Sequence, residues 1–346
     1  MAGVALNFCE KQAWWDKLRD PLMLWRIDSK FLANSRQSKI KSYKAESIWH
    51  VAAELGNLKA LQKLWELTEE LLTREEIKNK LLLGTDSERR TAWHWAPEWG
   101  ELENLQIVWE WAKEKLTTED LKNKLLLVTD CEGMNALHII ARMENLEKLK
   151  IVREWAEDKL TTEEIKNKLL LGTDKEGRTA WDTAAQWGRL DNLKILWEWA
   201  ENKLTTEEII SKWLLGTDKK GMTAWHRTAE WGRLEKLKNV REWAEEKLTT
   251  EEIKNKLLLG RDNEGKTAWD RAAEWGRLEN LQILWEWAGE KLTTEEIKNK
   301  LLLGTDNKGR TALDRATELG SLENLQVLWE WAKEKLTTEE IKINCY

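Results

Sequence analysis

Cysteine, histidine, proline and long apolar runs are all scarce in this chain of 346 residues. Its three cysteines, Cys9, Cys131 and Cys345, lie far apart and form no C-x-x-C pair, so they predict neither a disulfide framework nor a zinc site. No apolar run approaches the length that crosses a bilayer, and the first residues are too polar for a signal peptide. We therefore expect a protein of a reducing compartment, the cytosol or the nucleus, with no membrane partner.

The few histidines argue against an enzyme. All of them share one position of a repeated pattern: His50, His94, His138 and His226. No two have local metal-ligand spacing, and none is left for a Ser-His or Cys-His site. The many carboxylates recur on helix faces without a distinctive pair. We expect no enzyme activity, no cofactor and no metal.

The charge of the chain is acidic overall, with a formal net charge of -6. Residues 1–41 are basic, so the acidity belongs to the rest of the chain. Because phosphate backbones need a basic face, an acidic body argues against nucleic acid as a partner.

What the chain does contain is a repeat of 44 residues. The same aspartate returns at Asp86, Asp130, Asp174, Asp218, Asp262 and Asp306. A period of this length indicates an elongated array in which each copy mainly contacts its neighbours. Such arrays present long surfaces, which favours binding over catalysis.

One copy, residues 174–217, predicts three helices. Thr179 is a natural N-cap, and Thr205 to Glu208 form a capping box. The predicted elements are a turn with Asp174 and Gly177, a helix at 180–187 ended by Gly188, a helix from about 191, and a third helix through Ile209 to Leu215.

The first two-thirds of the copy resembles the ankyrin repeat. The stretch D-K-E-G-R-T-A-W-D-T-A-A-Q-W-G at 174–188 follows the family's turn and first helix, with Ala for its proline and Trp for its leucine. It is most similar to the Trp-rich 44-residue ankyrin arrays of arthropod predicted proteins. The resemblance implies an all-α solenoid with a concave groove for protein partners, and a hydrogen-bonding role for the His/Asp position. It covers 42–346 as seven copies that begin near 42, 86, 130, 174, 218, 262 and 306.

The two ends of the array depart from the pattern. Residues 1–41 lie outside the period, and both a helical lid over the first copy and disorder remain open. The last copy carries Leu313 and Leu319 where inner copies mostly have Trp, as an end unit does.

Most of the 25 tryptophans fall into four columns of the repeat. The first column replaces the ankyrin leucine and is predicted to be core: Trp49, Trp93, Trp181, Trp225 and Trp269. The second is also predicted to be core: Trp111, Trp155, Trp199, Trp243, Trp287 and Trp331. The third alternates with arginine and is predicted to be half-exposed: Trp65, Trp109, Arg153, Trp197, Arg241, Trp285 and Trp329.

The fourth column ends the first helix, where the resemblance implies the border of the groove: Trp99, Met143, Trp187, Trp231 and Trp275. Two interpretations remain open. The rings pack on a neighbouring helix or copy, or they form a ladder of anchors for a partner, since Trp is enriched at binding hot spots.

Cations gather on the same expected face. They are Arg178, Arg227, Lys266, Arg271, Arg310 and Arg315, joined after the glycine by Arg189, Arg233 and Arg277. They predict either a stripe that binds an acidic segment of a partner or local i,i+3 pairing with glutamates.

Two sequence features need separate treatment. The stretch 260–267 matches a phosphate-binding loop, but a helix is expected before it and sister copies lack the lysine, so we interpret it as a turn. Pro97 lies inside a first helix and Glu144 replaces a helix-ending glycine, which predicts a kink or softness in copies two and three.

The sequence therefore predicts a monomeric, non-enzymatic array that binds a protein along its groove. Its expected contacts are Trp99, Trp187, Trp231 and Trp275 with the six cations of the turns and first helices. A structural spacer without a groove ligand is the alternative, and an acidic non-protein ligand such as RNA is a third.

Overall fold

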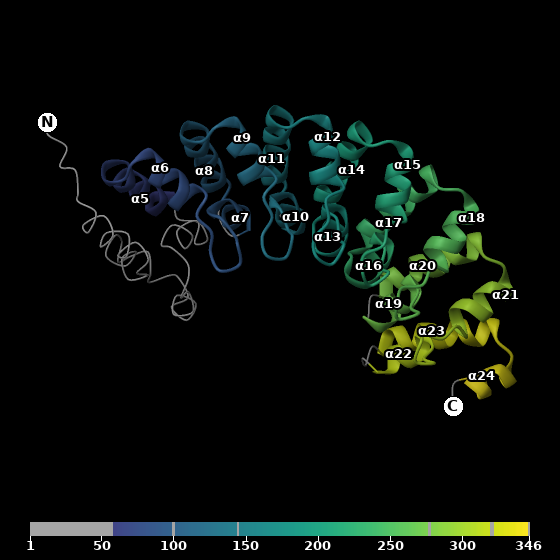
Figure 1. The fold of residues 1–346 in the computed structure, drawn as a ribbon. Helices are drawn as coiled ribbons and strands as arrows, with labels where there is room; N and C mark the ends of the chain where they lie inside the picture. The colour runs from purple at the N-terminus through teal and green to yellow at the C-terminus, as the bar shows by residue number, and fades with distance from the viewer. Residues whose placement is uncertain (1–57, 99–100, 144, 276–277, 319–321, 345–346) are drawn as a thin grey trace, which may run out of the picture. The chain divides into compact units, whose positions relative to one another are not determined.

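The computed structural model describes residues 58–346 except 99–100, 144, 276–277, 319–321 and 345–346. Every regular element within this part is a helix (Figure 1). The chain divides into two compact bodies: the first comprises the described residues of 1–140 and 145–169, and the second those of 141–144 and 170–346. Within each body, successive copies pack in chain order, so the predicted all-helical repeat array is confirmed at this level.

The helices follow one another in a fixed order. The first body contains α5 (Leu58–Leu71), α6 (Arg74–Glu76), η1 (Ile77–Leu82), α7 (Ala92–Glu98), α8 (Leu102–Lys115), α9 (Thr118–Leu121), η2 (Lys122–Leu126), α11 (Leu146–Lys159) and α12 (Thr162–Glu164). The chain passes between the bodies within α10 (Ala136–Arg142) and η3 (Ile165–Leu170). The second body contains α13 (Ala180–Gln186), α14 (Leu190–Lys203), α15 (Thr206–Glu208), η4 (Ile209–Leu214), α16 (Ala224–Trp231), α17 (Leu234–Lys247), α18 (Thr250–Glu252), η5 (Ile253–Leu258), α19 (Ala268–Glu274), α20 (Leu278–Lys291), α21 (Thr294–Glu296), η6 (Ile297–Leu302), α22 (Ala312–Glu318), α23 (Leu322–Lys335) and α24 (Thr338–Asn344).

Capping residues set the helix starts as the sequence predicted. The Thr205 side chain accepts from the Glu208 amide, and the Glu208 carboxylate accepts from the Thr205 amide at 2.9 Å. The first helices use the same reciprocal box, with Asp or His as its third residue. Thr179 and Asp182 form it in α13, and the Nδ1 atom of His226 takes the carboxylate's place in α16. The side chain at the His/Asp position therefore hydrogen-bonds the N-cap threonine, in keeping with the hydrogen-bonding role that the resemblance implied.

The third helix differs from the prediction, because only its first turn is α-helical and the rest is a π-helix in most copies. In η4 the buried residues are Ile209, Trp213 and Leu214, spaced i, i+4 and i+5. A π-helix closes its hydrogen bonds over five residues, so its wider turn brings this spacing onto one face. In the last copy the Leu-Leu-Leu run is missing, and its third element, α24, is α-helical.

The first tryptophan column is buried in the core of its described copies, as predicted. Trp93, Trp181 and Trp225 have no exposed surface, and Trp269 has 1%. Trp49 lies outside the described residues, and leucine takes the position in two other copies. Burial of an indole in these four copies removes a large apolar area from water, which makes this column a main source of stability.

The second and third columns were assigned wrongly in part. Trp109 and Trp197 of the third column are buried, whereas Trp155 and Trp243 of the second are half-buried. The reason is that the columns meet across copies. Trp109 stacks on Trp155 with ring centres 4.5 Å apart, and Trp197 stacks on Trp243 at 4.7 Å. Positions that face apart within one helix thus form one interface between neighbouring helices.

Arginine replaces tryptophan in the third column because it makes the same kind of contact. The Arg241 guanidinium lies 5.5 Å from the ring centre of Trp287 in the next copy. A flat cation over an indole face is favourable, and Trp287 is fully buried there. The expected packing of a flat side chain is confirmed at this position.

In the second body, a polar residue near the start of the second helix joins neighbouring copies. The Nδ2 atom of Asn280 donates to the carbonyls of Ala229 at 3.1 Å and Gly232 at 3.0 Å. Lys236, in the equivalent position, donates from Nζ to the Ala185 carbonyl at 2.7 Å. The last carbonyls of a helix have no partner within that helix, so the next copy satisfies them.

The repeated aspartate organises the turn that opens each copy. Oδ1 of Asp262 accepts from the amides of Glu264 and Lys266, both at 2.9 Å. Gly265 has φ +80°, a left-handed conformation that glycine adopts without strain. In the first body Arg89 occupies the same turn position with φ 60°.

Two further expectations meet the structure differently. Helix α7 contains Pro97, yet it is seven residues long, the same length as α10 and α13. The softness predicted for this copy stays a prediction. Glu144 lies outside the described residues. No helix in the described part of the chain is long and apolar enough to cross a membrane.

Candidate functional site

The fourth tryptophan column forms a ladder on the surface of the second body. Trp187 is 51% exposed, Trp275 is 43% exposed, and Trp231 between them is half-buried. The ring centres of Trp187 and Trp231 are 5.3 Å apart, and those of Trp231 and Trp275 are 4.4 Å apart. We call these three residues the ladder. Both earlier interpretations describe part of it, because each ring packs on the next copy while the outer two stay exposed.

The ladder arises because each first helix ends at its tryptophan. Trp187 caps α13 and Trp231 is the last residue of α16. The following glycine is needed for space and has no left-handed φ: a Cβ on Gly188 would lie 2.3 Å from the Ala141 carbonyl oxygen. The helix ends just before Gly188 as predicted, and close packing, not a left-handed backbone, requires the glycine there. The equivalent Trp99 lies outside the described residues.

A groove of about 570 Å³ runs beside two of the ladder rings. It is lined by Gln186, Trp187, Gly188, Arg189, Leu190, Asp191, Trp231, Arg233, Glu235 and Lys236. Its size is in the range of sites that bind ligands or peptide side chains. The lining comes from the ends of α13 and α16 and the starts of α14 and α17, so two neighbouring copies build it.

The groove carries cations and anions in a defined arrangement. Arg189 and Arg233 are exposed at its surface. Asp191 and Glu235 lie in the first turns of α14 and α17, where a helix dipole favours negative charge. Lys236 is buried, and its ammonium group donates to carbonyls at the end of α13. The accessible cations of the groove are therefore its two arginines.

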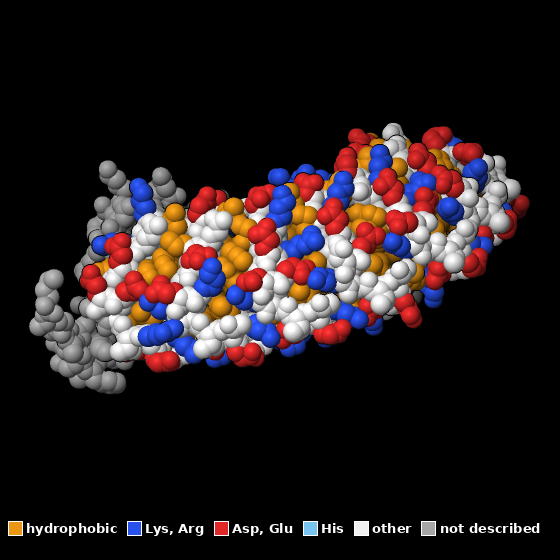
Figure 2. Space-filling model, turned by 90° about the horizontal axis from the view of Figure 1, so that it is seen from above, with side chains coloured by type: hydrophobic (Ala, Val, Ile, Leu, Met, Phe, Trp, Pro, Cys, Tyr) orange, Lys and Arg blue, Asp and Glu red, His pale blue; other side chains and the backbone are white. Residues whose placement is uncertain are grey.

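Charge on the wider surface is mixed. On the face shown in Figure 2, acidic and basic side chains alternate over the described residues, with hydrophobic side chains between them. No region of one sign dominates that view.

Four of the six predicted contact cations are buried inside the array. The Nε atom of Arg271 binds Asp262 at 2.8 Å, and Nη2 of Arg315 binds Asp306 at 3.0 Å. Arg227 binds Asp218 in the same way, and Lys266 binds Glu274 at 2.6 Å. The local pairing that the sequence left open thus occurs mainly with the turn aspartates nine residues earlier, and it holds the turn against the first helix.

The other two cations are partly exposed. Arg178 pairs with Asp174 at 2.7 Å, and Arg310 pairs with Asp306 at 3.0 Å and with Glu318 at 2.6 Å. Their side chains are 28% and 23% exposed. A role in partner binding stays a prediction for all six cations.

Titratable groups near the first helices have shifted pKa values because they are buried. Burial raises the pKa of Asp182 to about 6 against the opposing effects of Arg227 and the Thr179 bonds. Burial lowers the pKa of His226 to about 4, so this imidazole is neutral at pH 7. Both side chains complete capping boxes within the core, and neither belongs to the groove lining.

Other candidate sites offer less. Among the described residues, no group of three or more His, Cys, Asp or Glu side chains is placed to hold a metal. The stretch 260–267 lies between the helices η5 and α19, and the Lys266 ammonium binds the carboxylates of Glu264 and Glu274.

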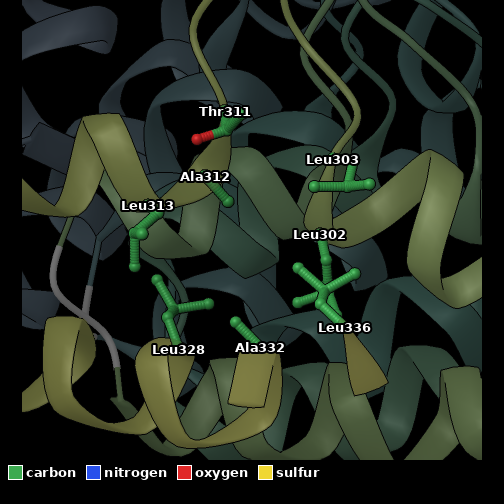
Figure 3. Close-up of a pocket in the computed structure, with 8 residues that line it drawn as sticks. All are labelled: Leu302, Leu303, Thr311, Ala312, Leu313, Leu328, Ala332 and Leu336. Atoms are coloured by element: carbon green, nitrogen blue, oxygen red, sulfur yellow. The ribbon is translucent and has the colours of Figure 1, made fainter. Parts of the chain in front are cut away.

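An apolar cavity beside the last copy is shown in Figure 3. At about 10 Å³ it has room for about one water molecule. Leu313 and Leu328 line it from α22 and α23, where Leu328 is buried and Leu313 is half-buried.

Sequence reasoning missed several groove residues. Asp191 and Glu235 belong to a position that is acidic in six copies, and Gln186 stands where most copies have glutamate, so both positions resembled ordinary solvated helix ends. The signal that was available is the recurring order Trp-Gly-Arg-Leu-acid at 187–191 and 231–235. Lysine replaces asparagine at this position in two copies, as Lys148 and Lys236, which marks a position with a shared polar contact. No family model and no curated protein matches this chain, so the ankyrin resemblance stays a prediction.

Proposed function

We propose that this chain is a non-enzymatic, ankyrin-like array that binds another protein at the ladder. The observation that carries the proposal is exposure. Only three large apolar side chains of the described residues are exposed, and two of them, Trp187 and Trp275, belong to the ladder. Exposed indoles are costly in water and are enriched at binding hot spots. Cytosol or nucleus is the proposed location, and the chain is proposed to act as a monomer.

The spacing of the rings argues for protein over nucleic acid. Neighbouring ring centres are 4.4 and 5.3 Å apart, so the faces between them are already in contact. A nucleobase that stacks on aromatic side chains needs an open ring face. The ladder offers such faces only at its ends, whereas its exposed edges form a continuous apolar ridge for a protein surface.

The array itself supplies the test variant. Met143 occupies the ladder position in another copy, so the triple substitution Trp187→Met, Trp231→Met and Trp275→Met uses a side chain that this fold accepts. Partners are captured from cell lysate with the wild-type chain, this variant and a control triple. The control replaces the exposed second-helix residues Lys194, Lys238 and Gln282 by alanine.

The proposal expects a partner that the wild type and the control retain and the ladder variant loses, while all three proteins give the same circular dichroism melt. A partner retained by the ladder variant would remove the ladder from the proposal. A spacer or scaffold without a groove ligand would then be the better account.

A further inference from the structure

We propose that the last copy binds an amphipathic helix of a partner protein on the side that earlier copies turn toward their successors. The bound helix carries an asparagine and, seven residues later, an aromatic ring. On the last copy this side contains Leu313, Leu322, Leu325 and Trp329, which we call the end surface. The inference adds a second binding site and does not depend on the ladder.

The end surface is uncovered within the described residues of the second body. Leu322 is 66% exposed, more than either outer ring of the ladder. Leu325 is half-buried, whereas its equivalent in the preceding copy, Leu281, is 1% exposed. A Cβ on Gly309 would meet no atom within 4 Å, whereas one on Gly265 would lie 2.5 Å from the asparagine of the next turn. The preceding copy is therefore covered at these positions by its successor, and the last copy is not.

Trp329 is the indole that an incoming ring would cover. Its equivalent in the preceding copy, Trp285, stacks on Trp331 of the next second helix, with ring centres 4.6 Å apart and the planes 11° from parallel. Trp197 stacks on Trp243 in the same way at 4.7 Å. Because the same contact recurs between copies, it indicates the chemistry of the missing partner, a flat ring on the indole face.

A lysine beside Trp329 is compatible with such a ring. The Nζ atom of Lys333 lies 5.7 Å from the ring centre of Trp329. In the first body, Lys115 lies at the same distance from Trp65, and Trp65 still stacks on Trp111 at 4.4 Å. A lysine at this distance therefore leaves one face of the indole accessible to a second ring.

The asparagine of the bound helix is inferred from the contacts between earlier copies. In the second body, Asn280 donates to the carbonyls of Thr228 at 3.2 Å and Ala229 at 3.1 Å, near the end of the preceding first helix. The equivalent carbonyls of the last copy are those of Ala316 and Thr317 in α22. Carbonyls at the end of a helix need a donor from outside that helix, which an asparagine supplies.

A second copy of this chain fits the end surface less well than another protein does. The second helix of the first copy, α5, has Ala60 and Leu67 where all later copies have Asn or Lys and Trp. It therefore brings neither the donor nor the ring. Later second helices, such as α17, α20 and α23, already pack on the copy before them. The occupant is thus a partner helix with both residues.

The test uses a peptide with the sequence of residues 278–291, the helix α20, and the full chain. A hydrocarbon staple joins positions 282 and 286, which are exposed in α20, because a helix of this length is marginal in water. Fluorescence anisotropy of the fluorescein-labelled peptide measures binding.

Two substitutions in the peptide test its chemistry. We expect Trp287→Ala to weaken binding at least about tenfold and Asn280→Ala to weaken it about threefold. Trp285→Ala is the matched control, because residues two apart on a helix face different ways, and it should leave the affinity within about twofold.

Variants of the full chain locate the contact. Trp329→Ala is expected to weaken peptide binding at least about tenfold. Trp329→Arg should stay within about threefold of the wild type, because Arg241 at the equivalent position lies over Trp287. The triple tryptophan-to-methionine variant of the ladder should bind the peptide as the wild type does. Circular dichroism melts of all variants accompany the titrations.

Several results would overturn the inference. They are equal binding of the wild-type and Trp287→Ala peptides, full binding by the Trp329→Ala chain, or loss of binding in the ladder variant. Self-association of the full chain in sedimentation, if Trp329→Ala abolished it, would also overturn the inference, because a second copy would then occupy the end surface. If Trp329→Ala unfolds the last copy, the Trp287→Ala and Trp285→Ala peptides decide the outcome on the wild-type chain.

Discussion

At equivalent positions of different copies, one residue type replaces another when both side chains can make the same contact. Arg241 lies over Trp287 where other copies stack two indoles, and Lys236 donates to helix-end carbonyls where Asn280 does so. His226 and Asp182 both complete a capping box. The contact is therefore kept while residue type changes, which explains variation at buried positions of the repeat.

Arg89 is the residue whose backbone does not suit its type. Its φ of 60° belongs to a turn position that holds glycine in five other copies, among them Gly177 at φ +80°. A side chain costs about 1–2 kcal/mol in this region. We expect Arg89→Gly to stabilise the chain by about 1 kcal/mol and Gly177→Ala to destabilise it by a similar amount, measured by urea unfolding. A neutral or destabilising Arg89→Gly would show that this turn is not strained.

Asp182 predicts a pH dependence with an unusual sign. Its pKa is raised to about 6 in the fold from 3.8, so between these values the native state binds the proton that the unfolded chain releases. The contribution of this group to stability is present at low pH and is lost as pH rises through 6.

The comparison is between the wild type and Asp182→Asn over pH 4–7. Relative to the variant, we expect the unfolding free energy of the wild type to increase by up to about 3 kcal/mol as pH falls from 7 to 4. A difference that is constant over this range would mean that Asp182 has an ordinary pKa in the fold.

Among whole elements, the first helix fixes the ladder through the close approach of its end to the preceding copy. A Cβ on Gly188 would lie 2.3 Å from the Ala141 carbonyl oxygen, whereas a Cβ on Gly289 in α20 meets no atom within 4 Å. We expect Gly188→Ala to destabilise the chain by about 1–3 kcal/mol. Gly289→Ala is the matched control and should stabilise it by about 0.5–1 kcal/mol, because alanine favours the helix. Similar effects of the two substitutions in urea unfolding would contradict the packing described for Gly188.

The third helix of each copy shows which features of a helix can be predicted from the sequence. Its capping box was readable, because Thr205 and Glu208 have the spacing of a known local motif. Its π-helix was not predicted, although the i, i+4, i+5 spacing of Ile209, Trp213 and Leu214 was visible. Local motifs predict where a helix starts, whereas its winding depends on which side chains the neighbouring copies bury.

For the molecule as a whole, the 44-residue period predicted a repeat array whose copies pack in order, and the capping signals of one copy predicted its helices. The pairing of tryptophan columns could not be predicted from one copy, since Trp197 finds its partner, Trp243, only in the next. Burial of the contact cations was missed for the same reason: Arg315 lies between Asp306 of its own turn and Asp270 of the preceding copy. Contacts between copies decide which repeated positions remain available to a partner.

The most direct test of the ladder as a binding surface is hydroxyl-radical footprinting of the full chain, alone and with its captured partner, read by mass spectrometry. In the free chain we expect fast oxidation at Trp187 and Trp275 and slow oxidation at the buried Trp181 and Trp225. Partner binding should slow oxidation at Trp187 and Trp275 several-fold and leave the buried pair unchanged. Equal oxidation rates at Trp187 and Trp181 in the free chain, or no protection by a saturating partner, would contradict the account.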